Sequence, residues 1–143
     1  MAKSSNRLLA EHPDLPARLR EAMFKSSSGE LAWPLDEAGE AVTWIASRGL
    51  STLGGEAWHL DEVGQITAVI PVTGSAIPAV RGWSVKDRQQ DEHWQAFVVR
   101  CRDEGLIALA REAATIREEV PPTLHRGLRY NLTVVSEQEY LEL

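Results

Sequence analysis

The sequence of 143 residues lacks the features that mark several large classes of protein. It contains one cysteine, so the chain cannot form an internal disulfide and fits a reducing compartment. It has no apolar run close to the roughly 20 residues that a membrane-spanning helix needs. Its first residues lead into polar sequence instead of the apolar core of a signal peptide. We therefore expect a cytoplasmic protein that does not insert into a membrane.

Positive charge is also scarce, with 15 basic residues against 21 acidic ones and a net charge of −6. This balance argues against a nucleic-acid-binding protein and suits a partner with a basic surface. Hydrophobic residues make up 43% of the chain and charged residues 25%, as in ordinary globular proteins. The length predicts a single domain over residues 1–143.

The sequence shows no established catalytic or metal-binding motif. The four histidines are far apart, without HxxxH or HxH spacing, so we expect no metal site: His12, His59, His93 and His125. The GxSxG signature of serine hydrolases is absent. Gly54 and Gly55 lack the other glycines and the lysine of a phosphate-binding loop, so we expect no bound cofactor.

Two residues deserve a catalytic interpretation beside a structural one. His59 lies near Glu56 and Asp61, and strand alternation places His59 and Asp61 on one side, which allows an exposed acid–base pair. Exposed groups would keep ordinary pKa values, so a structural role is favoured. Cys101 falls on the apolar side of a predicted helix, where a small buried hydrophobe is favoured over a nucleophile. We therefore expect that the protein is not an enzyme.

The longest periodic segment spans residues 91–116 and predicts the central helix. Its apolar residues recur at steps of three and four: Trp94, Phe97, Val98, Cys101, Gly105, Ala108, Leu109 and Ile116. Asp91 is the expected N-cap, and Pro121 and Pro122 prevent continuation. Trp94 and Phe97 should pack against a sheet. Gly105 marks either a close contact or a break into two helices.

A second helix is predicted to start at Pro34 and to end before Gly49. Asp36 and Glu37 lie in its first turn, where the helix dipole favours negative charge. Residues 1–30 predict a peripheral segment of one or two short helices, which the serines and glycine of residues 25–29 end.

Between and after these helices the period changes to two, which predicts strands. Residues 53–60 and 65–70 form a hairpin around a turn at residues 61–64, an irregular loop follows over residues 71–78, and residues 80–85 form a short strand. Residues 128–134 alternate most regularly and predict a strand that is paired on both edges. The expected order is helix, helix, strand, strand, strand, helix, strand. This order predicts an α+β fold with a mostly antiparallel sheet of about four strands and helices packed on one face.

Four acidic residues are the best candidates for contact with a basic partner. Glu37 and Glu40 are expected on the outer face of a helix, and Asp61 and Glu62 at the tip of a hairpin. Such positions are exposed, and charges there can steer association with a partner.

Two blocks of the sequence resemble one family of bacterial polymorphic-toxin immunity proteins. The first is residues 41–50 followed by Leu53-Gly54-Gly55-Glu56, which is similar to the family's helix–glycine–strand pattern. The second is Gly82-Trp83 and residues 93–98, with Cys101 where the family has a small hydroxyl residue. The loop of residues 71–80 is also longer than usual. The resemblance covers roughly residues 34–135.

The resemblance implies an α+β protein that binds and neutralises a cognate toxin domain without catalysis of its own. It brings no toxin-binding residues and does not identify the toxin. The alternative is a small-molecule-binding domain or an unrecognised small enzyme with a tryptophan-lined pocket. A deep cavity bordered by Trp58, Trp83 and His59 would favour this alternative, whereas a flat or convex acidic surface would favour the immunity protein.

Overall fold

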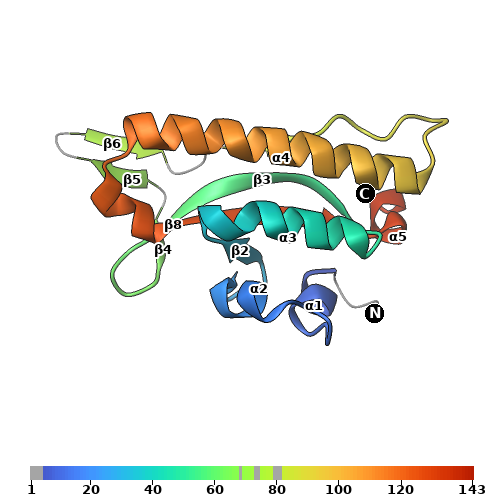
Figure 1. Cartoon of the computed structure of the whole chain (residues 1–143), viewed down its shortest axis with the longest axis horizontal. Coiled ribbons are helices and arrows are strands. Elements are labelled where there is room, and N and C mark those ends of the chain that lie inside the picture. Colours follow the sequence, from blue (N-terminus) through green and yellow to red (C-terminus); the bar gives the residue numbers. More distant parts are fainter. Residues whose placement is uncertain (1–4, 68, 73–74, 79–81) are drawn as a thin grey trace.

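The computed structural model describes residues 5–67, 69–72, 75–78 and 82–143. It is an α+β fold in which helices α3 (Leu35–Ser47) and α4 (Trp94–Glu119) cover one face of an antiparallel sheet (Figure 1). The α+β class and the helices on one face are as predicted. Among the described residues the sheet has six strands where about four were expected, and two further strands form a separate hairpin.

The six strands run in the order β1-β2-β8-β3-β4, and β7 pairs with the same strand β3. Their bounds are β1 Phe24–Lys25, β2 Leu31–Trp33, β3 Ser51–Leu60, β4 Ile66–Thr67, β7 Gly82–Ser84 and β8 Leu128–Val135. Every pairing in the sheet is antiparallel. Strand β8 pairs with β2 on one edge and β3 on the other, so the prediction for residues 128–134 is confirmed.

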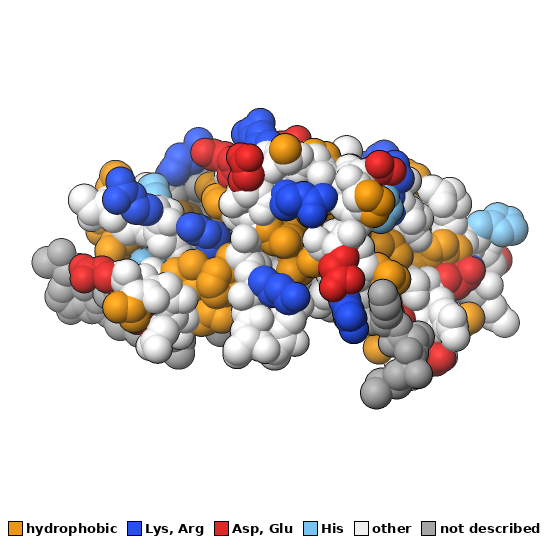
Figure 2. Space-filling model, turned by 90° about the horizontal axis from the view of Figure 1, so that it is seen from below, with side chains coloured by type: hydrophobic (Ala, Val, Ile, Leu, Met, Phe, Trp, Pro, Cys, Tyr) orange, Lys and Arg blue, Asp and Glu red, His pale blue; other side chains and the backbone are white. Residues whose placement is uncertain are grey.

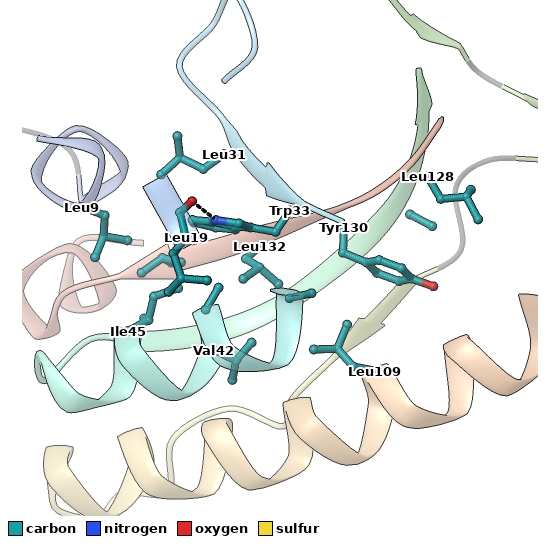
Figure 3. Packing of buried hydrophobic residues seen from close by; sticks show 14 of the residues in the cluster. Leu9, Leu19, Leu31, Trp33, Val42, Ile45, Leu109, Leu128, Tyr130 and Leu132 are labelled. Atoms are coloured by element: carbon teal, nitrogen blue, oxygen red, sulfur yellow. Dashed lines mark hydrogen bonds between the residues drawn. The ribbon is translucent and has the colours of Figure 1, made fainter. Parts of the chain in front are cut away.

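The hydrophobic core lies between this sheet and the two large helices (Figure 3). From β8 it receives alternate residues, Leu128, Tyr130, Leu132 and Val134. Helix α3 contributes Ala38, Ala41, Val42 and Ile45, as its apolar stripe predicts. Helix α4 adds Leu109 and Ile116 to the same cluster.

Helix α3 begins and ends close to the predicted positions. Pro34 is its N-cap, where a missing N–H costs nothing. Gly49 follows the C-cap with a φ of 75°, a left-handed conformation that glycine adopts readily.

Helix α4 is a single helix of 26 residues, which settles the alternatives for Gly105. Gly105 therefore marks no break; it faces α3, where a Cβ atom would lie at an ordinary contact distance of 3.6 Å from Cγ1 of Val42. The expected start was wrong, because the N-cap is His93 and Asp91 lies in the preceding turn.

The predicted burial of the start of α4 is only partly correct. Phe97 is fully buried, but Trp94 is half-buried. The ring of Trp94 contacts Tyr140 of helix α5 (Glu137–Leu141), and its Nε1 donates to the carbonyl of Gly49 at 2.8 Å. Trp94 therefore links the start of α4 to the end of α3 and to α5.

The N-terminal region contains helices α1 (Ser5–Ala10) and α2 (Ala17–Ala22), followed by β1 and β2, which the sequence did not predict. The Nε1 atom of Trp33 in β2 donates to the carbonyl of Leu19 at 2.8 Å (Figure 3). Leu9 and Leu19 are fully buried in the core cluster.

The predicted hairpin of residues 53–70 is present, but β4 is only two residues long. The expected loop of residues 71–78 instead contains strands β5 (Val69–Val72) and β6 (Ser75–Pro78), which pair with each other. The expected strand of residues 80–85 is β7, and its residues 80 and 81 lie outside the described part of the chain. A 3-10 helix, η1 (Pro122–Gly127), leads from α4 into β8.

None of the helices in the described part of the chain has the length and apolar character needed to cross a membrane.

Candidate functional site

The four predicted contact residues lie in two places. Glu37 and Glu40 are on the outer side of α3, where Arg18 of α2 lies between them, 3.6 Å from a carboxylate oxygen of each. The Arg18 side chain is 64% exposed, so these ion pairs contribute little to stability. Both acids thus already have a basic neighbour in their own chain.

Asp61 and Glu62 lie in the turn between β3 and β4. The Asp61 carboxylate accepts hydrogen bonds from the backbone N–H groups of Val63 at 2.9 Å and Gln65 at 2.8 Å. Gly64 completes the turn with a φ of 82°. Asp61 therefore builds the turn, while Glu62 is exposed on it.

Two large apolar side chains are exposed beside these acids. Val63 is 78% exposed and Ile66 is 43% exposed. We call Asp61, Glu62, Val63 and Ile66 the hairpin tip; the turn projects from the body of the molecule at the lower left of Figure 1. The sequence analysis identified the acids of the hairpin tip but not its apolar residues. The position of Val63 between turn-forming residues was a signal that its side chain would be exposed.

A pocket of about 640 Å³ adjoins the hairpin tip. Its lining includes Asp61 and Glu62 from the turn, His59 from β3, Arg126 from η1 and Arg129 from β8. Burial lowers the pKa of Arg129, and the charge of Glu37 on α3 opposes that shift. Arg129, which the sequence analysis did not single out, therefore lies near Glu37 and lines the same pocket as Asp61 and Glu62.

His59 is not the exposed base that strand alternation allowed. It is 7% exposed, and a Cβ atom at Gly127 would lie 2.8 Å from its Nε2 atom. Burial lowers the pKa of His59, and the nearby Asp61 carboxylate opposes that shift. The exposed acid–base pair that the sequence allowed is therefore not formed, because β8 and η1 cover the imidazole, and this burial agrees with the structural role favoured from the sequence.

Trp58, Trp83 and His59 do not border one cavity. His59 lines the pocket beside the hairpin tip, while Trp83 lines another of about 340 Å³ with Gly55 and Glu56; Trp58 lines neither. Trp58 instead donates from Nε1 to the Glu56 carboxylate at 2.9 Å and contacts the ring of Phe24.

A larger pocket of about 720 Å³ lies between the first turn of α3 and the second half of α4. Arg126 and Arg129 line this pocket as well as the one beside the hairpin tip. The sequence carried one signal for this region, since two of the five residues of segment 125–129 are arginines and a third is a histidine, in an acidic chain. Their convergence with α3 and α4 depends on the tertiary fold.

No group of three or more His, Cys, Asp or Glu side chains suited to a metal ion occurs within the described ranges. Glu37 and Glu40 both pair with Arg18, and Glu37 also lies near Arg129. Asp61 and Glu62 line the pocket beside the hairpin tip.

Comparisons of the chain with protein-family models, with curated proteins and with solved structures give no match.

Proposed function

We propose that this protein is an immunity protein that binds and neutralises a cognate bacterial toxin domain, with the hairpin tip as its contact surface. The observation that supports the proposal best is the exposure of Val63 and Ile66 beside Asp61 and Glu62. Apolar side chains at the centre of an interface, with charged groups at its rim, are typical of protein–protein recognition.

The position of the tip suits this role. The tip projects from the sheet, and its backbone is held by the Asp61 hydrogen bonds and by the pairing of Leu60 with Ile66. A turn that is already ordered loses little conformational entropy when it binds a partner. The resemblance of residues 41–50, 53–56, 82–83 and 93–98 to immunity proteins supports a toxin domain as the partner, and the acidic net charge of −6 supports a basic contact surface on that toxin.

The mechanism is occlusion of the toxin by a bound protein. Burial of Val63 and Ile66 against the toxin supplies affinity, because each side chain leaves water on binding. The Glu62 carboxylate attracts basic residues of the toxin and acts mainly on the association rate. No chemistry by the immunity protein is required.

Binding of the purified toxin domain encoded by the adjacent gene tests the proposal. Val63→Asp should weaken binding at least tenfold, chiefly through faster dissociation, because it places a charge at the centre of the interface. Glu62→Lys should slow association and reduce its dependence on salt.

Two matched variants control for changes elsewhere on the surface. Ile107 is 55% exposed on α4, so Ile107→Asp makes the same kind of change away from the tip. Glu118→Lys, near the end of α4, reverses an exposed charge in the same way. Equal effects of the tip variants and their controls, or no complex with the wild-type protein, would contradict the proposal.

A further inference from the structure

An elongated groove runs between α3 and α4 at the end of the molecule that carries η1. We call it the α3–α4 groove; it has a volume of about 720 Å³, within the range of small-molecule sites. Its lining is Pro34, Leu35, Asp36 and Gly39 from the start of α3, Leu106, Leu109, Ala110, Ala113, Ile116 and Arg117 from α4, and His125, Arg126, Leu128 and Arg129.

The floor of the groove is apolar. Leu109, Ile116 and Leu128 are buried at its base. The α4 residues that line it recur at steps of three and four from Leu106 to Arg117, so they form one stripe along the helix. At a rise of 1.5 Å per residue this stripe is about 16 Å long, which suits a linear apolar body better than a compact one.

One end of the groove is basic. Arg117, Arg126 and Arg129 line it, and the only carboxylate in the lining is that of Asp36. Within the described part of the chain, none of the three arginines forms a salt bridge. On the left half of Figure 2, basic side chains surround hydrophobic ones, although the chain as a whole has a net charge of −6.

Within the described ranges, the hydrogen bonds of these guanidinium groups leave some of their N–H donors unused. Arg129 donates from one terminal nitrogen to the carbonyls of Arg126 and Leu128, and Arg117 donates to the carbonyl of Ala113 in its own helix. Burial lowers the pKa of Arg129, and the opposing charge of Glu37 offsets this shift only in part, so the guanidinium charge is incompletely solvated. An anion at this end of the groove would restore that solvation.

We propose that the α3–α4 groove binds a straight-chain carboxylate of medium length. The carboxylate is held by Arg126, Arg129 and Arg117, and the hydrocarbon chain lies along the α4 stripe over Leu109 and Ile116. A guanidinium group recognises a carboxylate through paired hydrogen bonds, and each methylene group that leaves water adds to the affinity. This inference is independent of the proposed toxin contact, because Val63 and Ile66 do not line the groove.

Calorimetric titration with sodium decanoate tests the inference. We expect saturable binding at one site, at least tenfold tighter than that of decanol or decyltrimethylammonium, because these probes share the chain and lack the carboxylate. Shifts of backbone amide signals in nuclear magnetic resonance spectra should centre on Leu109, Ala113 and Leu128. Binding of all three probes with similar affinity, or shifts centred elsewhere, would overturn the inference.

Two variants test separately the contributions of the carboxylate and of the hydrocarbon chain to binding. Arg117→Gln with Arg126→Gln should weaken decanoate binding at least tenfold and leave decanol binding unchanged. Ala113→Trp should block both, because it fills the groove without removing a charge. The control is Arg102→Gln with Arg111→Gln, which removes two arginines of α4 that do not line the groove. An equal loss in this control, or full binding by both groove variants, rejects the site.

Discussion

Cys101 is the residue for which sequence and structure agree most fully. It is completely buried in α4, and burial raises the pKa of its thiol to about 11, while the nearby Ser51 hydroxyl opposes the shift. The thiol is therefore both protected and protonated at neutral pH, which supports the structural interpretation of this residue over a nucleophilic one.

Thiol labelling checks this interpretation. An aromatic disulfide reagent should react slowly with the folded protein at pH 8 and rapidly once urea unfolds it. The raised pKa also means that Cys101 favours folding below its ordinary pKa of 9.0, and that this contribution is lost as the pH rises toward about 11. Rapid stoichiometric labelling of the folded protein would contradict the account.

Glu92 holds the segment that precedes α4. Its carboxylate accepts hydrogen bonds from Arg100 at 2.9 and 3.0 Å, and this lowers the pKa of Glu92 to about 2. Arg100 also donates to the carbonyls of Lys86 and Asp87, so one arginine fixes both ends of the segment.

The pH dependence of stability should show this interaction. Because the folded-state pKa is depressed, Glu92 stabilises the fold above its ordinary pKa of 4.5, and the contribution is lost as the pH falls toward about 2. Glu92→Gln should therefore lower the urea midpoint at pH 7 and have a smaller effect at pH 3.5. Glu118→Gln is the control, and a difference that is equal at both pH values would argue against the interaction.

At the scale of elements, the glycines differ in whether the surrounding structure leaves room for a side chain. A Cβ atom at Gly105 of α4 would make only ordinary contacts, at 3.6 Å from Val42 and 3.9 Å from Trp83. A Cβ atom at Gly55 of β3 would lie 2.6 Å from the carbonyl oxygen of Asn131 and 2.6 Å from the ring of Trp83. The double glycine of β3 is therefore needed for packing between β8 and β7.

This contrast predicts that alanine substitutions at the two glycines change the stability of the protein in opposite directions. Gly105→Ala should stabilise the protein by about 1 kcal/mol, since alanine favours a helix more than glycine does. Gly55→Ala should destabilise it by about 1–3 kcal/mol through overpacking. Urea denaturation of both variants measures the two changes. Destabilisation by Gly105→Ala would mean that α3 and α4 pack more closely than described.

The elements whose bounds the sequence predicted most closely are those with enough residues to show a period. Helices α3 and α4 and strands β3 and β8 each have at least eight residues. Strands β1 and β2 have two and three residues, too few for an alternation to be recognised. Strands β5 and β6 contain prolines that suggest a loop, but a strand tolerates proline at an edge without a partner.

At the scale of the whole molecule, net charge was a poor guide to the surface. The chain is acidic overall, yet Figure 2 shows basic, acidic and hydrophobic side chains mixed on one face. Glu37 and Glu40 pair with Arg18, and Asp61 builds a turn, so only Glu62 of the four predicted acids stands exposed on the hairpin tip. Pairing between distant residues cannot be read from the sequence alone.

The α3–α4 groove could not be predicted from the sequence for the same reason. Its arginines come from α4, η1 and β8, and each by itself resembles an ordinary surface residue. Only the antiparallel packing of α3 on α4, with β8 beneath them, brings the arginines to one end of an apolar stripe. The apolar stripe itself was visible in the sequence as the widened hydrophobic face of residues 106–116.

The central claim is that the hairpin tip neutralises a toxin, and co-expression tests it most directly. The toxin domain encoded by the adjacent gene is produced in a sensitive host together with the wild-type protein, with Val63→Asp, or with Ile107→Asp. The account predicts growth with the wild-type protein and with Ile107→Asp, and loss of protection with Val63→Asp at equal amounts of folded protein. Failure of the wild-type protein to protect, or full protection by Val63→Asp, would contradict it.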